Sequence, residues 1–268
     1  MNRMTRQEAR GLAEKCLELL VADRDEAALE AFDPLLSTKT PFPILDLVGK
    51  ILGEWGREEP QKLLAFFDHL VGTRAMGAFV IAGQGLIAIN DVDLELSFAK
   101  AREYIIRGDV WYVVDIIGER PLGHGLLLHF DGAVGLLEGF TRDANPWVRR
   151  SVGVAVHFFA KRVRDDPARI ERLLALLAPL IEERDTSALK GIGWGLKTIG
   201  RYYPDLLVSF LHRELATKRP RKLLLRKATT YLDEAKKEEV RRINCSGGQP
   251  CLRSRAATAG RRYGTEIP

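Results

Sequence analysis

A tryptophan and an aspartate stand four residues apart in the segment WYVVD, which spans residues 111–115. On a helix, Trp111 and Asp115 would share one face. Asp115 has Val and Ile on both sides, and a carboxylate in apolar surroundings is costly unless it is paired or has a chemical task. The pattern leaves two interpretations open. Either the two residues belong to a functional surface, or Trp111 is a core residue and Asp115 caps a helix or pairs with an arginine.

A second candidate is the segment NPWVRRS over residues 145–151. Asn145 is a typical N-cap, and proline is favoured at the first position of a helix. Arg149 and Arg150 would then lie in the first turns, where they could bind phosphate or pair with Asp115. The alternative is that they serve only the packing between neighbouring repeats.

A third candidate is the segment KGIGWGLK over residues 190–197. Its glycines resemble a nucleotide-binding fingerprint, but no strand precedes them, so the match carries little weight. Glycine inside a helix costs about 1 kcal/mol relative to alanine, which suggests that another backbone or a ligand comes close. Trp194 is either a core residue or a π surface for a cation or a sugar. Lys190 and Lys197 flank it.

Basic residues are concentrated in two places. Six of the ten residues from 218 to 227 are Lys or Arg, including Lys218, Arg219, Arg221 and Lys222, and the formal net charge is +5. A second cluster comprises Arg149, Arg150, Lys161, Arg162 and Arg164. Such stripes suit a polyanion such as DNA, because phosphate contacts carry most of the affinity. The alternative is a solvated helix face.

The elements that position these residues are all predicted to be helices. Apolar residues recur at helical spacing along the chain, and no useful alternating strand pattern is present. Prolines 43, 60, 146, 167 and 204 stand at expected helix starts. We expect at least ten helices over 4–22, 24–36, 43–55, 60–71, 74–89, 92–106, 109–118, 122–138, 145–163, 167–182, 186–201, 204–215 and 221–239.

The starts of three of these segments repeat weakly along the chain. They lie at 109, 145 and 187, and intervals of 36 and about 42 residues are typical of HEAT-like helix pairs. Stacked pairs form a curved solenoid with a concave face. We therefore predict an all-α fold, with one HEAT-like helical-repeat domain over 1–240. Residues 241–268 form a basic tail with few apolar residues, which we expect to be disordered.

Several classes of protein are disfavoured by the sequence. No apolar run approaches the length of a membrane span, and the N-terminus has no signal-peptide core, so we expect a cytoplasmic protein. The three cysteines form neither a disulfide framework nor a zinc site, and the five histidines show no ligand spacing. We expect no cofactor, no metal and no membrane partner.

Taken together, the three candidate segments resemble the active-site stretches of the AlkD-type DNA alkylation-repair glycosylases. The resemblance rests on a Trp-x-x-x-Asp helix, an Asn-x-Trp-x-Arg-Arg helix start and an Ile-Gly-Trp helix, in this order, and covers about residues 100–235. It implies that Trp111, Asp115 and Trp194 flank a damaged nucleotide. It also implies that an arginine binds the DNA backbone, Arg150 before Arg149. Tyr112 stands where the family usually has an acidic residue.

The resemblance further implies hydrolysis of the N-glycosidic bond of N3- or N7-alkylated purines in double-stranded DNA, by a monomer that needs no cofactor. We assign DNA contacts to Arg149, Arg150 and the lysines and arginines at 190, 197, 218, 219, 221 and 222. Two alternatives remain, a HEAT-like scaffold for a protein partner and a non-catalytic DNA-binding protein. Convergence of Trp111, Asp115 and Trp194 on a basic concave face would favour the enzyme.

Overall fold

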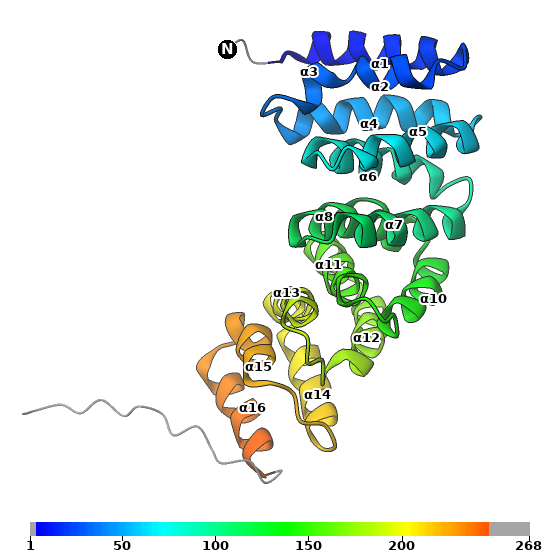
Figure 1. Cartoon of the computed structure of the whole chain (residues 1–268). Coiled ribbons are helices and arrows are strands. Elements are labelled where there is room, and N and C mark those ends of the chain that lie inside the picture. Colours follow the sequence, from blue (N-terminus) through cyan, green and yellow to red (C-terminus); the bar gives the residue numbers. More distant parts are fainter. Residues whose placement is uncertain (1–3, 247–268) are drawn as a thin grey trace, which may run out of the picture.

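The computed structural model describes residues 4–246, and this part of the chain forms sixteen α-helices and no strand (Figure 1). The all-α prediction is therefore confirmed. The helices are α1 (Arg6–Val21), α2 (Asp25–Glu30), α3 (Asp33–Leu36), α4 (Phe42–Gly56), α5 (Pro60–Gly72), α6 (Met76–Ile89), α7 (Leu94–Gly108), α8 (Trp111–Ile117), α9 (Gly123–Leu128), α10 (Phe130–Thr141), α11 (Pro146–Arg162), α12 (Pro167–Leu177), α13 (Thr186–Tyr202), α14 (Pro204–Leu215), α15 (Lys222–Ala228) and α16 (Glu234–Ser246). Three short turns join them, namely η1 (Gly118–Leu122), η2 (Ala178–Leu180) and η3 (Thr229–Tyr231).

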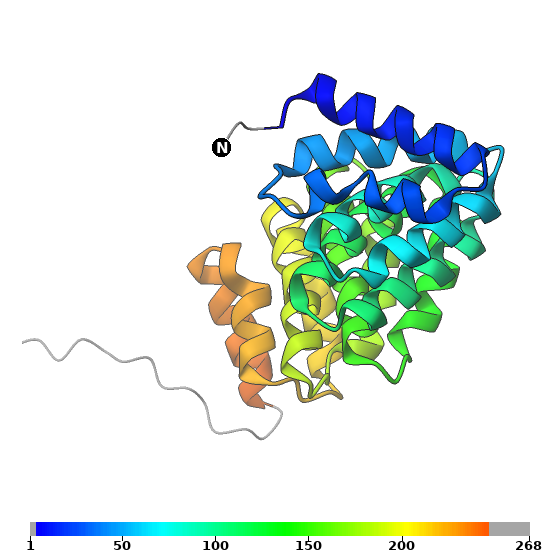
Figure 2. The ribbon, with the colours of Figure 1, turned by 45° about the horizontal axis from the view of Figure 1, so that its top comes forward.

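The helices pack as sequential pairs in two rows. One row, here called the inner row, runs through α4, α6, α8, α11, α13 and α15, each packed against the next. The outer row contains α5, α7, α10, α12, α14 and α16. The stack bends so that α8, α13 and α15 line the inner side of the bend (Figure 1). This arrangement is that of HEAT-like repeats. Figure 2 shows α1–α3 covering one end of the stack and α15 and α16 closing the other.

Local sequence explains where the main helices begin. Proline is the first residue of α5, α11, α12 and α14, as expected, because its missing N–H is not needed there. The Asn145 side chain accepts a hydrogen bond from the backbone N–H of Trp147 at 2.8 Å, which confirms the predicted N-cap of α11. Asp185 caps α13 in the same way, through the N–H groups of Ser187 and Ala188.

The prediction of one helix over 122–138 was wrong. Helix α8 continues through η1, a π turn, into α9, and the break comes at His129, whose φ of −130° and ψ of 51° are not helical. Pro121 lies inside η1 and has no N–H to donate, and it is at this residue that the helix widens into a π turn. The wider π turn accommodates a missing hydrogen bond of this kind without ending the helix.

The C-terminal boundary also differs from the expectation. The expected helix over 221–239 is divided by η3, and α16 runs to Ser246, past the boundary expected at residue 240. The rest of the expected tail, from residue 247, lies outside the described residues.

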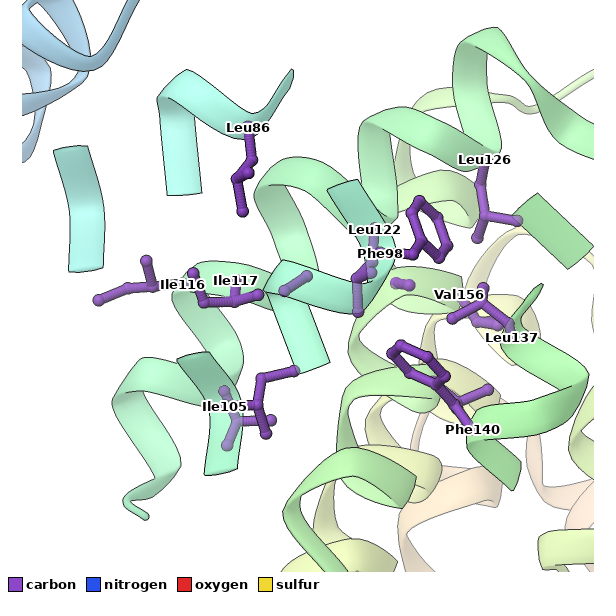
Figure 3. Close-up of a cluster of buried hydrophobic side chains, with 14 of the residues drawn as sticks. Leu86, Phe98, Ile105, Ile116, Ile117, Leu122, Leu126, Leu137, Phe140 and Val156 are labelled. Carbon is purple, nitrogen blue, oxygen red and sulfur yellow. The ribbon is translucent and has the colours of Figure 1, made fainter. Parts of the chain in front are cut away.

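Helix α8 is anchored by a hydrophobic cluster on the side away from the bend. Ile117 belongs to a core cluster that also contains side chains of α6, α7, α9 and α11, including Leu86, Phe98, Leu126 and Val156 (Figure 3). This anchoring fixes the face of α8 that carries Trp111 and Asp115. Within residues 4–246, no helix has the length and apolar character required to cross a lipid bilayer.

Candidate active site

Asp115 and Arg150 form a paired contact where α8, α11 and α13 lie side by side. The Arg150 Nε donates to Asp115 Oδ1 at 2.9 Å, and Nη2 donates to Oδ2 at 3.0 Å. The third nitrogen, Nη1, donates to the backbone oxygen of Ser187 at the start of α13 at 2.9 Å. Of the alternatives left open by the sequence, the structure shows the pairing with an arginine.

The pair is largely removed from solvent. The side chains of Arg150 and Asp115 are 8% and 20% exposed. Burial raises the pKa of Asp115, while the charge and hydrogen bonds of Arg150 oppose that rise. Arg150 therefore keeps a negative charge at a place where burial alone would disfavour it.

Trp111 is 58% exposed and does not belong to the core. Its ring meets the ring of Tyr112 edge-on, with 5.8 Å between centroids. Both aromatic residues line a pocket of about 290 Å³ between the starts of α4 and α6 and the helix α8. Asp115 and Glu119 line the same pocket, as do Phe42, Met76, Ile116 and Arg120.

Trp194 lies on α13 and stacks on His157 of α11. The two ring centroids are 3.9 Å apart and the ring planes differ by 23°. The Nδ1 atom of His157 is 2.6 Å from the hydroxyl oxygen of Thr198. Burial, together with Lys161, Arg162 and Lys197, lowers the pKa of His157 to about 4, so this imidazole is neutral near pH 7. Trp194 therefore rests on a fixed, uncharged support.

The glycines of α11 and α13 let the two backbones approach closely. A Cβ atom at Gly153 would overlap the backbone of Gly191, and a Cβ at Gly191 would come within 2.5 Å of the Arg150 oxygen. A Cβ at Gly195 would lie 2.7 Å from the Gly153 oxygen. The close approach that the sequence suggested is thus a packed helix. Gly193 instead faces the side chain of Lys227 on α15.

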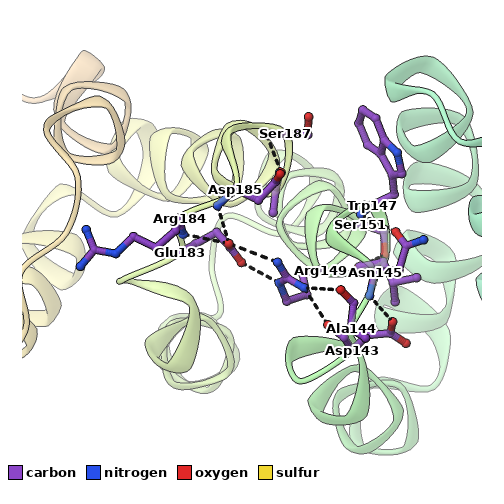
Figure 4. Close-up of polar contacts among 12 residues, drawn as sticks. Asp143, Ala144, Asn145, Trp147, Arg149, Ser151, Glu183, Arg184, Asp185 and Ser187 are labelled. Atoms are coloured by element: carbon purple, nitrogen blue, oxygen red, sulfur yellow. Dashed lines mark hydrogen bonds and ion pairs between the residues drawn. The ribbon is translucent and has the colours of Figure 1, made fainter.

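Arg149 points to the outside of this junction (Figure 4). Its Nε and Nη2 atoms donate to the Glu183 carboxylate at 2.6 and 3.2 Å, and Nη1 donates to the backbone oxygens of Asp143 and Ala144. All three nitrogens have protein partners at the loops that precede α11 and α13. The structure thus gives Arg149 a role in joining consecutive repeats.

Lys190 and Lys197 lie on the same face of α13 as Trp194. Lys190 is exposed, and the Nζ of Lys197 lies 4.9 Å from the centroid of the Tyr231 ring. Burial, and then Lys197 and Lys190, lower the pKa of Lys227 on α15. Cations from two neighbouring inner-row helices therefore gather beside Trp194.

The expected DNA-binding residues at 218–222 lie in the connection between α14 and α15, with Lys222 as the first residue of α15. Lys218 donates to the Ala178 oxygen and to the Glu214 carboxylate, both at 2.7 Å. Arg219 donates to the Leu215 and Lys218 oxygens, and Arg221 donates to the Arg184 oxygen. Lys222 is exposed at the first position of α15. Three of these four residues therefore hold the connection between two repeats.

Sequence reasoning did not single out Glu119, His157 or Lys227. Glu119 stands four residues after Asp115 and eight after Trp111, so helical spacing alone could have placed it on the same face. No local signal marks His157, because it reaches Trp194 only through the packing of separate helices, and Lys227 was marked only as the end of the basic run 218–227.

Comparison with known proteins points to one family. The model of the family described as DNA alkylation repair enzyme matches residues 46–232. No curated protein matches the chain. Within residues 4–246 there is no group of three or more His, Cys, Asp or Glu side chains arranged to hold a metal ion.

Proposed function

Because the chain belongs to the DNA alkylation repair enzyme family, we propose that it is a DNA glycosylase that hydrolyses the N-glycosidic bond of purines alkylated at N3 or N7. The observation that carries the proposal is the position of Asp115. It is paired with Arg150 of α11 and lines a pocket with the exposed Trp111, while Trp194 lies on α13, which packs against α11 in the same inner row.

This arrangement suits the chemistry of an alkylated purine. Such a base is cationic and leaves readily, so the barrier lies in the oxocarbenium-like sugar that forms as the bond breaks. A carboxylate fixed in a partly buried site stabilises that charge without reorganising. We assign this role to Asp115, with Arg150 as the residue that holds it. The faces of Trp111 and Trp194 add cation–π stabilisation and keep the deoxyribose in place.

The phosphates would be bound by the cations beside Trp194. Lys190 and Lys197 are on the face of α13 that carries Trp194, and Lys227 adds a third charge from α15. Such contacts are independent of base sequence. The proposal places the main phosphate contacts on these lysines rather than on Arg149, whose nitrogens are engaged with protein partners.

A second function is favoured by the same ion pair. If the only task of Asp115 is to neutralise the buried Arg150, the protein is a non-catalytic HEAT-like module that binds DNA or a protein partner. The two functions differ in whether the negative charge of Asp115 acts on a substrate.

Release of damaged bases tests the proposal directly. Duplex DNA methylated at purines is incubated with an excess of the protein, and free 7-methylguanine and 3-methyladenine are measured by chromatography. We expect one or both bases to be released together with abasic sites. Tight binding of the DNA without release of either base would contradict the glycosylase and support the non-catalytic module.

A further inference from the structure

The carboxylate of Asp115 is not free to take up a proton. Both of its oxygens accept hydrogen bonds from Arg150 in a bidentate pair. Such a pair stabilises the ionised carboxylate, and a proton on either oxygen would remove the charge that strengthens it. Hydrolysis also requires that a proton leave the attacking water. A second carboxylate with free oxygens near Asp115 is better placed to accept it.

Glu119 is the carboxylate that the site provides for this purpose. It lies one helical turn beyond Asp115 and lines the same pocket as Asp115 and Trp111. Its side chain is 36% exposed, and no side chain or backbone group in residues 4–246 donates a hydrogen bond to it. Its Oε1 lies 3.9 Å from His157 Nε2, beyond direct hydrogen bonding.

The surroundings of Glu119 favour a basic carboxylate. Burial raises its pKa, and Asp115 on α8 raises it further, while Arg120, Arg162 and Lys161 lower it. Two of these cations have other partners. Arg120 is paired with Asp46 of α4 at 2.8 Å, and the guanidinium of Arg162 stacks on a ring of its own helix.

His157 leaves the charge of Glu119 uncompensated. Its pKa of about 4 keeps the imidazole neutral, and the contacts with Trp194 and Thr198 fix the ring. The gap between His157 Nε2 and Glu119 Oε1 allows one water molecule to hydrogen-bond to both atoms. Their separation of 3.9 Å is shorter than two hydrogen bonds of about 2.8 Å each.

We propose that Glu119 is the proton acceptor for the attacking water, in an inference that rests on the proposed glycosylase function. The purine leaves with the electron pair of its bond to C1′, and the departing cation becomes a neutral base. The water oxygen forms the new bond to C1′, and its proton passes to a carboxylate oxygen of Glu119. The proton is then released to solvent. Asp115 stays ionised throughout and stabilises the sugar cation.

Chemical rescue separates this role from a structural one. Glu119→Ala removes the base and leaves space for a small carboxylate, whereas Glu119→Gln removes the base and keeps the space filled. Single-turnover release of 7-methylguanine is measured for both variants with increasing sodium formate, and the melting temperature of each is recorded. Glu171→Ala serves as the control, because Glu171 is exposed on the outer-row helix α12.

We expect both Glu119 variants to fold and to lose about 10²-fold or more in rate, the scale of a missing general base. Formate should restore a large part of the rate of Glu119→Ala in a saturable manner. It should leave Glu119→Gln, Glu171→Ala and the unmodified protein unchanged. Variants as fast as the unmodified protein would overturn the proposal, as would a slow Glu119→Ala protein that formate does not rescue. Absence of release by the unmodified protein would instead overturn the proposed function itself.

Discussion

Two helix pairs of the inner row, α4/α6 and α11/α13, pack closely through glycines in the same way. In the N-terminal half, Gly53 of α4 faces Gly85 of α6, and a Cβ at Gly53 would lie 2.7 Å from the Gly85 oxygen. In the C-terminal half, Gly195 of α13 faces Gly153 of α11 with the same separation of 2.7 Å. Both junctions bring two backbones together at glycines, and both helix pairs are closely packed.

The side chains that surround the two junctions differ. The α4/α6 junction presents Asp46, Lys50 and Glu54, a mixture of charges, on the partly exposed side of α4. The α11/α13 junction presents the Asp115–Arg150 pair, the His157–Trp194 stack and a gathering of lysines. The glycines therefore allow close helix packing at both junctions. Of the two, only the α11/α13 junction carries a set of residues suited to an alkylated nucleotide.

The largest expected effect concerns the two ion pairs of the inner row. Asp115→Asn removes the charge next to the proposed sugar cation, so single-turnover excision should fall by about one to three orders of magnitude. Asp46→Asn breaks the pair with Arg120 at 2.8 Å and frees this cation beside Glu119, so the rate per folded molecule should fall by a smaller factor.

Asp115→Asn also leaves Arg150 buried without its partner, so a loss of stability of up to about 3–5 kcal/mol accompanies the loss of activity. The rate must therefore be divided by the folded fraction, which thermal unfolding gives. A large stability loss with normal excision per folded molecule would show that Asp115 is only structural.

The next effect tests the close glycine contacts that the two junctions share. Gly53→Ala and Gly195→Ala each force a Cβ against a carbonyl oxygen at 2.7 Å, and each should cost about 1–3 kcal/mol. Gly135→Ala on α10, where nothing lies within 4 Å of the added atom, should instead stabilise by about 1 kcal/mol. Urea unfolding measures all three.

Of Gly53 and Gly195, only Gly195 lies next to the proposed site. Gly195→Ala should also reduce excision per folded molecule, because Trp194 is its neighbour in the chain, and Gly53→Ala should not. Equal losses of excision in both variants would mean that the two junctions act as one unit.

A smaller effect concerns pH. Since the folded pKa of His157 is about 4 and its ordinary value is 6.5, the unfolded chain takes up a proton between these values and the folded protein does not. Stability should therefore fall as the pH drops from 6.5 to 4, by about 1.4 kcal/mol per unit at most.

The matched variant is His157→Gln, which has no proton to take up at this position. The difference in unfolding free energy between the two proteins isolates His157, because the raised pKa values of Asp115 and Glu119 act in both. A difference that stays constant from pH 7 to pH 4 would contradict the neutral, buried imidazole.

The smallest effect concerns binding to DNA. Lys190→Ala on α13 should weaken binding to every sequence alike and reduce the slope of log affinity against log salt by about 1. Lys50→Ala, at another exposed position of the inner row on α4, should leave the slope unchanged. Fluorescence anisotropy over a series of salt concentrations measures both. Equal reductions of the salt slope in the two variants would indicate that the duplex contacts the whole inner row.

Much of the fold could be predicted from local sequence, because the signals are local. Proline at helix starts, the Asn145 cap and apolar residues at helical spacing depend only on neighbouring residues. The same spacing placed Trp111 and Asp115 on one face of α8. It did not predict the path through Pro121, since a π turn depends on how the surrounding helices hold the chain.

The partners of the charged residues were decided by tertiary structure alone. Arg149 and Arg150 are adjacent in the chain, yet one is bound by Glu183 at the repeat connection and the other by Asp115 at the proposed site. His157 is kept neutral first by burial, then by Lys161 and Arg162 of its own helix and by Lys197 of α13. The sequence determined which residue types were available and on which helix face. Burial and pairing between helices about 40 residues apart determined their charge and contacts, because desolvation and Coulomb energy depend on distance in space.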